Sequence, residues 1–140
     1  MSAIDFATEQ LEQDEGYRQF MYTDTAGKHT IGYGVNLDVG FDQGLAAAVL
    51  GFLVTRIDQS LSAYPWYAVL NDTRKSALLN MAYNLGIHGL LQFQDMIAAI
   101  TAQNWSEAKA QCLNSSAARL LPTRYGRIAD LLLTGNPSGD

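Results

Sequence analysis

The sequence predicts an α+β protein that is mostly helical, with one small β element near the N-terminus. Apolar residues recur at helical spacing over most of the chain. Residues Tyr17–Tyr22 lose this period and gain aromatic side chains. After the turn-forming run 23–28, the stretch His29–Val35 is rich in β-branched residues and punctuated by glycines. No internal repeat or low-complexity stretch interrupts the pattern. We therefore expect a small β-hairpin, followed by a helical region.

Capping residues indicate where the helices begin and end. Ser2 with Asp5 predicts the start of a first helix, and Gly16 predicts its end. A long helix is expected from about residue 42 to residue 62, because Pro65 cannot continue it.

The C-terminal half predicts further helices. Asn71 or Asp72 starts one that runs to Gly86, and its segment 76–85 is apolar nearly all round, which predicts a buried central helix. The residues expected to cap the two later helices are Asn104, with Glu107 three residues on, and Thr123.

Charge and hydropathy argue against several classes of partner. The 140 residues carry a net charge of −5, whereas a nucleic-acid binder usually presents a basic face. The first residues have neither the basic nor the apolar region of a signal peptide, and no apolar run approaches the roughly 18 residues of a membrane span. We therefore expect synthesis in the cytoplasm, no membrane insertion and no nucleic-acid partner.

The residue types that often form metal or thiol sites have structural interpretations here. Cys112 is the sole cysteine and lies in a helical pattern, which predicts a small buried hydrophobic side chain. His29 and His88 are isolated from one another, so we expect neither a metal site nor a cofactor. Trp66 and Trp105 are interpreted as core anchors rather than as platforms for sugar rings.

Two carboxylates flank the predicted β element. Glu15 ends the first helix, Asp24 lies in the turn, and Thr30 follows six residues later. Hydrolysis of a glycosidic bond uses one protonated carboxyl as the acid and one ionised carboxylate to activate water, and a threonine hydroxyl can hold that water. Spacing alone does not decide the matter, because most surface carboxylate pairs are solvated charges.

Three short segments around these residues carry a more specific motif: Glu15–Arg18, Tyr22–Gly27 and Thr30–Gly34. They resemble the signature of the phage-type lysozymes, glycoside hydrolase family 24, to which the T-even phage enzyme belongs. The family pattern is a Glu, eight residues, an Asp, five residues and a Thr. Further segments fall in register with the family: Asp72–Gly86, Phe93, Trp105–Ala108 and Pro122–Gly135.

The resemblance implies one lysozyme-like domain with a small lobe at about 15–40, a linking helix at about 42–62 and a helical lobe at about 65–135. It implies a cleft between the lobes and no cofactor. The implied reaction is cleavage of the β-1,4 bond between N-acetylmuramic acid and N-acetylglucosamine of peptidoglycan, with inversion of configuration, leading to lysis of the host cell.

The resemblance also implies residue roles. Glu15 would be the general acid, Asp24 the carboxylate that positions or activates water, and Thr30 its partner. The residues that would line the cleft are Tyr83, Phe93, Met96 and Gln111. Arg124 is expected to support the site by reaching the carboxylate of Glu15.

The chain departs from the family pattern in three places. The stretch between Gly34 and Pro65 is much shorter than in the T-even enzyme, which puts the number of sugar subsites in doubt. Val35–Leu37 replaces a common Gly-His-Leu run, and Ser115–Ala117 replaces a common Ser-Arg-Trp. The trimmed lobe is the main support for an alternative, a catalytically weak or inactive wall-binding module.

A lytic transglycosylase on a lysozyme-like fold is the other alternative. That reaction needs one Glu and no second carboxylate, so Asp24 favours hydrolysis. Activity on chitin stays open as a side reaction.

We expect a monomer that reaches the wall after release from the host cytoplasm through a separate holin.

Overall fold

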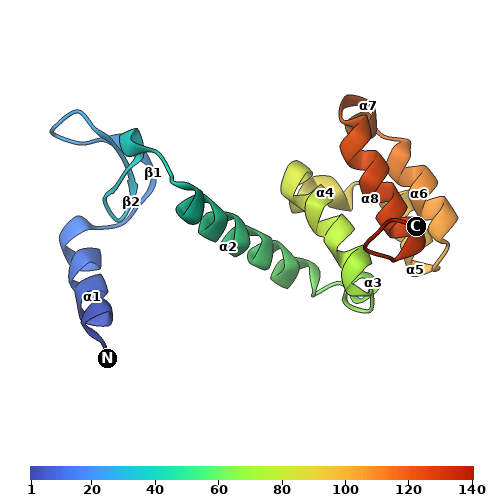
Figure 1. The fold of residues 1–140 in the computed structure, drawn as a ribbon, viewed down its shortest axis with the longest axis horizontal. Coiled ribbons are helices and arrows are strands. Elements are labelled where there is room, and N and C mark those ends of the chain that lie inside the picture. Colours follow the sequence, from blue (N-terminus) through green and yellow to red (C-terminus); the bar gives the residue numbers. More distant parts are fainter. The chain divides into compact units, whose positions relative to one another are not determined.

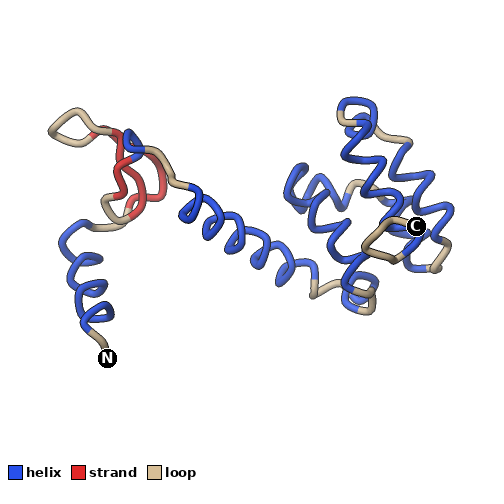
Figure 2. The backbone as a smooth tube through the Cα atoms, in the orientation of Figure 1, coloured by secondary structure: helices blue, strands red, loops and turns tan.

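The computed structural model describes residues 1–140 and divides into two compact units, Met1–Val49 and Leu50–Asp140. We call them the N-terminal unit and the C-terminal unit. The chain forms eight α-helices, one short 3₁₀-helix and one three-stranded sheet (Figures 1 and 2). The predicted α+β class, with a small β element near the N-terminus and a mostly helical remainder, is confirmed.

The N-terminal unit begins with helix α1, Ala3–Glu15. Ser2 caps it as predicted, because the Ser2 hydroxyl accepts a hydrogen bond from the Asp5 backbone N–H while the Asp5 side chain accepts from the Ser2 backbone N–H. Gly16 ends the helix with a φ of 68°, a conformation that favours glycine. Glu15 is therefore the last residue of α1.

Three short antiparallel strands follow, drawn in red in Figure 2. They are β1 (Arg18–Thr23), β2 (His29–Gly32) and β3 (Val35–Asn36), in the order β1-β2-β3. Thr30 on the central strand pairs with Tyr22 on one side and with Asn36 on the other. The predicted hairpin is present, and the third strand and the 3₁₀-helix η1 (Leu37–Val39) extend it.

The long helix α2, Gln43–Leu61, starts in the N-terminal unit and ends in the C-terminal unit. The Asp42 carboxylate accepts from the Leu45 backbone N–H at 2.8 Å, which satisfies one of the free donors at the start of the helix. Contrary to the sequence prediction, α2 is long and apolar enough to cross a membrane by length and composition. A core helix of a globular protein meets the same test, so this finding alone identifies no span.

Six helices complete the C-terminal unit. Their bounds are α3, Pro65–Ala68; α4, Asp72–Leu91; α5, Gln94–Thr101; α6, Trp105–Leu113; α7, Ser116–Leu120; and α8, Pro122–Thr134. Helix α8 packs against α4, α6 and α7, and α6 also packs against α5. The central-helix prediction is confirmed, since the core includes Ala77, Leu78, Met81 and Ala82 of α4.

Two predicted helix boundaries need correction. Helix α4 continues past Gly86 to Leu91, with a kink at Gly86, where φ is 76° and ψ is 159°. The prediction that Thr123 caps the last helix was wrong. Helix α8 starts two residues earlier than a Thr123 cap predicts, at Pro122, and its N-cap Leu121 makes no side-chain cap. Proline suits the first helical position because its φ is already helical and it has no N–H to satisfy.

Candidate active site

The side chain of Glu15 lies against Gly34, in the turn that joins β2 to β3. A Cβ atom added to Gly34 would stand 2.7 Å from the Glu15 carboxyl carbon and 3.1 Å from its Cγ. The φ of Gly34 is +72°, so this position also needs the backbone freedom of glycine. The absence of a side chain at Gly34 therefore leaves room for the Glu15 carboxylate.

An aromatic pair supports the same approach of α1 to the turn. Tyr17, two residues after Glu15, packs its ring against that of Tyr33, with centroids 5.6 Å apart and planes inclined at 49°. This tilted geometry lies within the favourable range for aromatic pairs. Contacts on both sides of Gly16 thus hold the end of α1 beside the β2–β3 turn.

Asp24 organises the turn between β1 and β2. Its Oδ1 accepts hydrogen bonds from the backbone N–H groups of Ala26, at 2.9 Å, and Lys28, at 2.8 Å. The Asp24 backbone N–H donates to the Lys28 carbonyl at 2.8 Å. Because Oδ1 alone makes the turn contacts, the side chain is held in place while Oδ2 is free to bind a water molecule.

Thr30 is the one buried polar residue of the protein, with 5% of its surface exposed. Its hydroxyl donates to the Lys28 carbonyl at 3.4 Å, a long contact. Asp24 and Thr30 therefore both bind the backbone of Lys28. This shared partner ties the two side chains to one turn.

The sequence prediction missed a polar contact next to this group. Asp38 of η1 accepts from the backbone N–H of His29 at 3.0 Å, and the two side chains meet at 2.8 Å between Nδ1 and Oδ1. The hydrogen bonds from the His29 ring and backbone lower the pKa of Asp38. This pair fastens η1 to the start of β2, one residue before Thr30.

Three of the residues expected to line a cleft share one pocket of about 310 Å³ in the C-terminal unit. They are Phe93, Met96 and Gln111. Gln111 is held by its own helix, because its amide donates to Glu107 at 2.8 Å. Met96 is 1% exposed, so its side chain also belongs to the core.

Tyr83 and Arg124 line a different pocket of about 340 Å³ in the same unit. Arg124 donates from Nε to the Asn80 side-chain carbonyl at 2.9 Å, and from Nη2 to the Asn80 backbone carbonyl at 3.3 Å. These bonds tie the start of α8 to α4. The expected approach of Arg124 to Glu15 stays a prediction.

Cys112 lies fully buried in the core, and burial raises the pKa of its thiol to about 12. The structure places no three His, Cys, Asp or Glu side chains where they could hold a metal ion.

Residues 12–121 match the family model described as phage lysozyme. The chain belongs to the phage lysozyme family. The matched range includes Glu15, Asp24 and Thr30, and the chain is accordingly a glycoside hydrolase of the lysozyme type.

Named relatives agree with the phage lysozyme assignment. The chain is 25% identical to each of two probable T4-type lysozymes of Dictyostelium discoideum, over 89% of this chain and 92% of each relative. It is 27% identical to the pre-baseplate central spike protein Gp5 of Enterobacteria phage T4, over 91% of this chain and 28% of that protein.

Several residues that shape this phage lysozyme site were not singled out from the sequence. Gly34 and Tyr33 belong to the quoted motif Thr30–Gly34, so a signal for them was present in the Gly-Tyr-Gly turn. Asp38 gave no such signal, because its partner His29 is nine residues away and the contact exists only once η1 folds back on β2.

Proposed function

We propose that the chain hydrolyses the β-1,4 bond between N-acetylmuramic acid and N-acetylglucosamine in bacterial peptidoglycan. The observation that carries this proposal is the placement of Glu15 at the end of α1 against the side-chain-free Gly34. A general acid must be held in one position, and both the glycine turn and the Tyr17–Tyr33 pair restrict where the Glu15 carboxyl can go.

The proposed roles follow from the donor and acceptor groups that each side chain does not already use in the fold. Glu15 donates its proton to the leaving glycosidic oxygen. Asp24, held through Oδ1, uses its free Oδ2 to orient and activate the attacking water. Thr30 accepts a hydrogen bond from the same water, since its hydroxyl oxygen keeps free lone pairs. Water entering on the face opposite the acid gives inversion of configuration.

Replacing the acid tests the proposal directly. Glu15→Gln keeps the shape of the side chain and removes its acidic proton, so hydrolysis of purified peptidoglycan should fall by about 10²–10⁴-fold. Glu12→Gln, on the same helix, is the matched control and should keep wild-type turnover. The rate is measured as reducing ends released, and wild-type turnover in Glu15→Gln would exclude Glu15 as the acid.

Product analysis in the same digest tests the reaction class and its stereochemistry. NMR of fresh product should show the α-anomer first, whereas a β-anomer would indicate retention and a different role for Asp24. Anhydro products identified by mass would indicate a lytic transglycosylase. No products, with the protein retained on the wall, would indicate an inactive wall-binding module.

We further propose that the chain is made in the cytoplasm of a bacterial host and lyses that host as a monomer, reaching the wall through a separate holin. Membership of the phage lysozyme family supports this route. Expression with and without a holin tests it, because lysis should require both proteins.

A further inference from the structure

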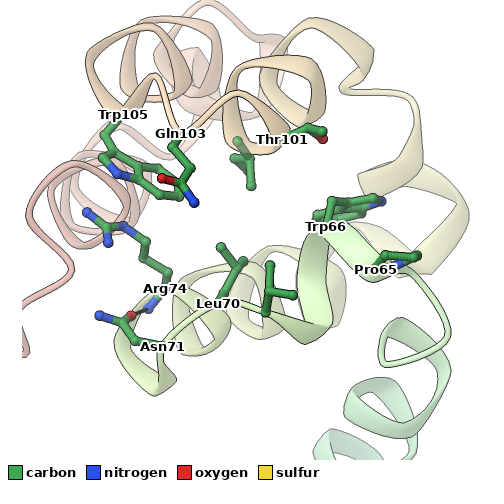
Figure 3. Close-up of a pocket in the computed structure, with 10 residues that line it drawn as sticks. Pro65, Trp66, Leu70, Asn71, Arg74, Thr101, Gln103 and Trp105 are labelled. Carbon is green, nitrogen blue, oxygen red and sulfur yellow. Dashed lines mark hydrogen bonds between the residues drawn. The ribbon is translucent and has the colours of Figure 1, made fainter.

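A pocket of about 400 Å³ lies between α3, the start of α4 and the α5–α6 connection (Figure 3). Its lining residues all belong to the C-terminal unit, and it shares none of them with the pocket of Phe93, Met96 and Gln111. Its volume falls in the range of roughly 300–1,000 Å³ that is usual for ligand pockets.

Both tryptophans of the protein line this pocket. Trp66 of α3 and Trp105 of α6 are half-buried and pack against the core, as the sequence predicted. Each also contributes to the wall of the pocket. Figure 3 shows them on opposite sides of the space. The pocket therefore has an indole in each of two opposite walls. The C–H face of a pyranose ring packs on a flat aromatic surface of this kind, and Trp66, unlike Trp105, has no cation stacked on its ring.

The polar groups of the pocket are held in place. The Arg74 guanidinium lies 3.8 Å from the centre of the Trp105 ring. It donates from Nε to the Leu132 carbonyl at 2.8 Å and from Nη2 to the Leu133 carbonyl at 3.0 Å. These bonds fix the guanidinium against the end of α8, where a Cβ added to Gly135 would stand 2.7 Å from Nη1.

Gln103 is the only residue other than glycine with a positive φ, at 56°. It follows the end of α5, where the neighbouring Asn104 N–H donates back to the Ala99 carbonyl at 2.8 Å, and glycine usually fills this position. A side chain here works against the backbone, yet Gln103 places an amide at the pocket. Strained residues of this kind cluster at functional sites.

The charge of the lining also restricts the ligand. Arg74 is the only charged residue among those that line the pocket, and no carboxylate is present, although the chain carries a net charge of −5. Two indoles and the amides of Asn71 and Gln103 suit an uncharged ligand that combines an apolar face with carbonyl and hydroxyl groups.

We propose that this pocket binds one N-acetylhexosamine unit of a glycan strand, as a second contact with the polymer outside the residues assigned to bond cleavage. The sugar ring packs on an indole. Its acetamido carbonyl accepts from the Gln103 amide, and the Gln103 carbonyl accepts from a hydroxyl. The inference rests on the proposed function, because it takes the ligand from the substrate of that reaction.

Tryptophan fluorescence reports on this pocket alone, since the protein has no tryptophan elsewhere. The full chain carrying Glu15→Gln, which spares the probe from hydrolysis, is titrated with an oligomer of four N-acetylglucosamine units. We expect a saturable change in tryptophan emission. An oligomer of four glucose units, which lacks the acetamido groups, should bind at least several-fold more weakly.

Gln103→Gly separates binding from folding. Glycine removes the amide and relieves the positive φ, so the melting temperature should stay equal or rise. Loss of the amide's hydrogen bonds should weaken oligomer binding by about 3- to 10-fold. Gln59→Ala, at an exposed glutamine of α2 outside the pockets described here, is the control and should leave binding unchanged.

The outcomes distinguish this inference from the proposed function. Tryptophan emission that does not respond to the oligomer, or a response that Gln103→Gly leaves unchanged, would overturn the pocket assignment. Equal binding of the glucose oligomer would overturn the assignment to N-acetylhexosamine. The proposed function is decided separately, by digestion of peptidoglycan with the wild-type chain, which does not use the tryptophan signal.

Discussion

At the scale of single residues, the candidate site depends on what Gly34 lacks. The motif residues Glu15, Asp24 and Thr30 could be chosen from the sequence because their spacing matches a family pattern. The residues that hold these side chains in place could not be identified in this way, because their contacts form only when the chain folds. The Lys28 backbone joins Asp24 to Thr30, and the Gly34 turn receives Glu15.

Gly34→Ala should lower peptidoglycan hydrolysis much more than its effect on folding explains. The new methyl group would overlap the Glu15 carboxylate and displace it, and misplacement of a catalytic group by about 1 Å can cost on the order of 10²-fold in rate. The measurement is the initial rate at a temperature where the variant is fully folded by circular dichroism.

Gly32→Ala is the matched control for this substitution. Gly32 also has a positive φ, +65°, but a Cβ there meets nothing within 4 Å. Both variants should lose about 1–2 kcal/mol of stability from the left-handed backbone. Equal losses of activity in the two would contradict the proposed role of the Glu15–Gly34 contact.

A second residue-scale prediction concerns Asp38 and pH. Because hydrogen bonds from His29 lower the pKa of Asp38 in the folded protein, the ionised form stabilises the fold above the unfolded pKa of roughly 3.9. That stabilisation is lost as pH falls through the folded pKa. Asp38→Asn should therefore lower the melting temperature near neutral pH and approach wild type in strong acid. A constant difference across the pH range would contradict this.

At the scale of elements, most helices that start with a capping side chain could be predicted, although the five-residue α7 was missed despite its Ser115 cap, and helices without a cap were missed or misplaced. Ser2, Asn71 and Asn104 all cap as expected. Helix α5 has Phe93 at its N-cap with no side-chain hydrogen bond, and the four-residue α3 is too short for a periodic pattern. Strand β3 has two residues, and pairing with β2 defines it rather than its own composition.

Two substitutions at predicted caps should separate a real cap from an apparent one. The Asn104 side chain accepts from the Glu107 N–H at 3.3 Å, so Asn104→Ala should cost about 1 kcal/mol of unfolding free energy. Thr123 lies inside α8 and caps nothing, so Thr123→Ala should stay within about 0.5 kcal/mol of wild type. Urea titration measures both, and equal losses would restore the original prediction for Thr123.

At the scale of the whole molecule, the buried core lies within the C-terminal unit, between Leu61 and Leu132, whereas the motif residues lie in the N-terminal unit. The position of the core and the division into units could be predicted to different degrees. Apolar periodicity identified the core helix α4 directly. The division of the chain after Val49, inside the periodic run of α2, has no counterpart in that pattern.

The net charge of −5 predicts how lysis depends on salt. An acidic protein gains no long-range attraction to an anionic wall, and repulsion is screened over about 10 Å at 0.1 M ionic strength. Lysis of cell walls should therefore rise or stay constant as salt increases to about 0.1 M. A steep fall over this interval, measured by turbidity, would indicate a local basic surface that controls binding.

The burial of Cys112 makes the protein well suited to single-site labelling. Its thiol is inaccessible and its pKa is raised, so maleimide reagents at neutral pH should not react with it in the native state. One cysteine introduced in each unit would then be the only reactive pair, with no need to mutate the core. Dyes or spin labels attached there would give the distance between the units in solution, free and with glycan bound.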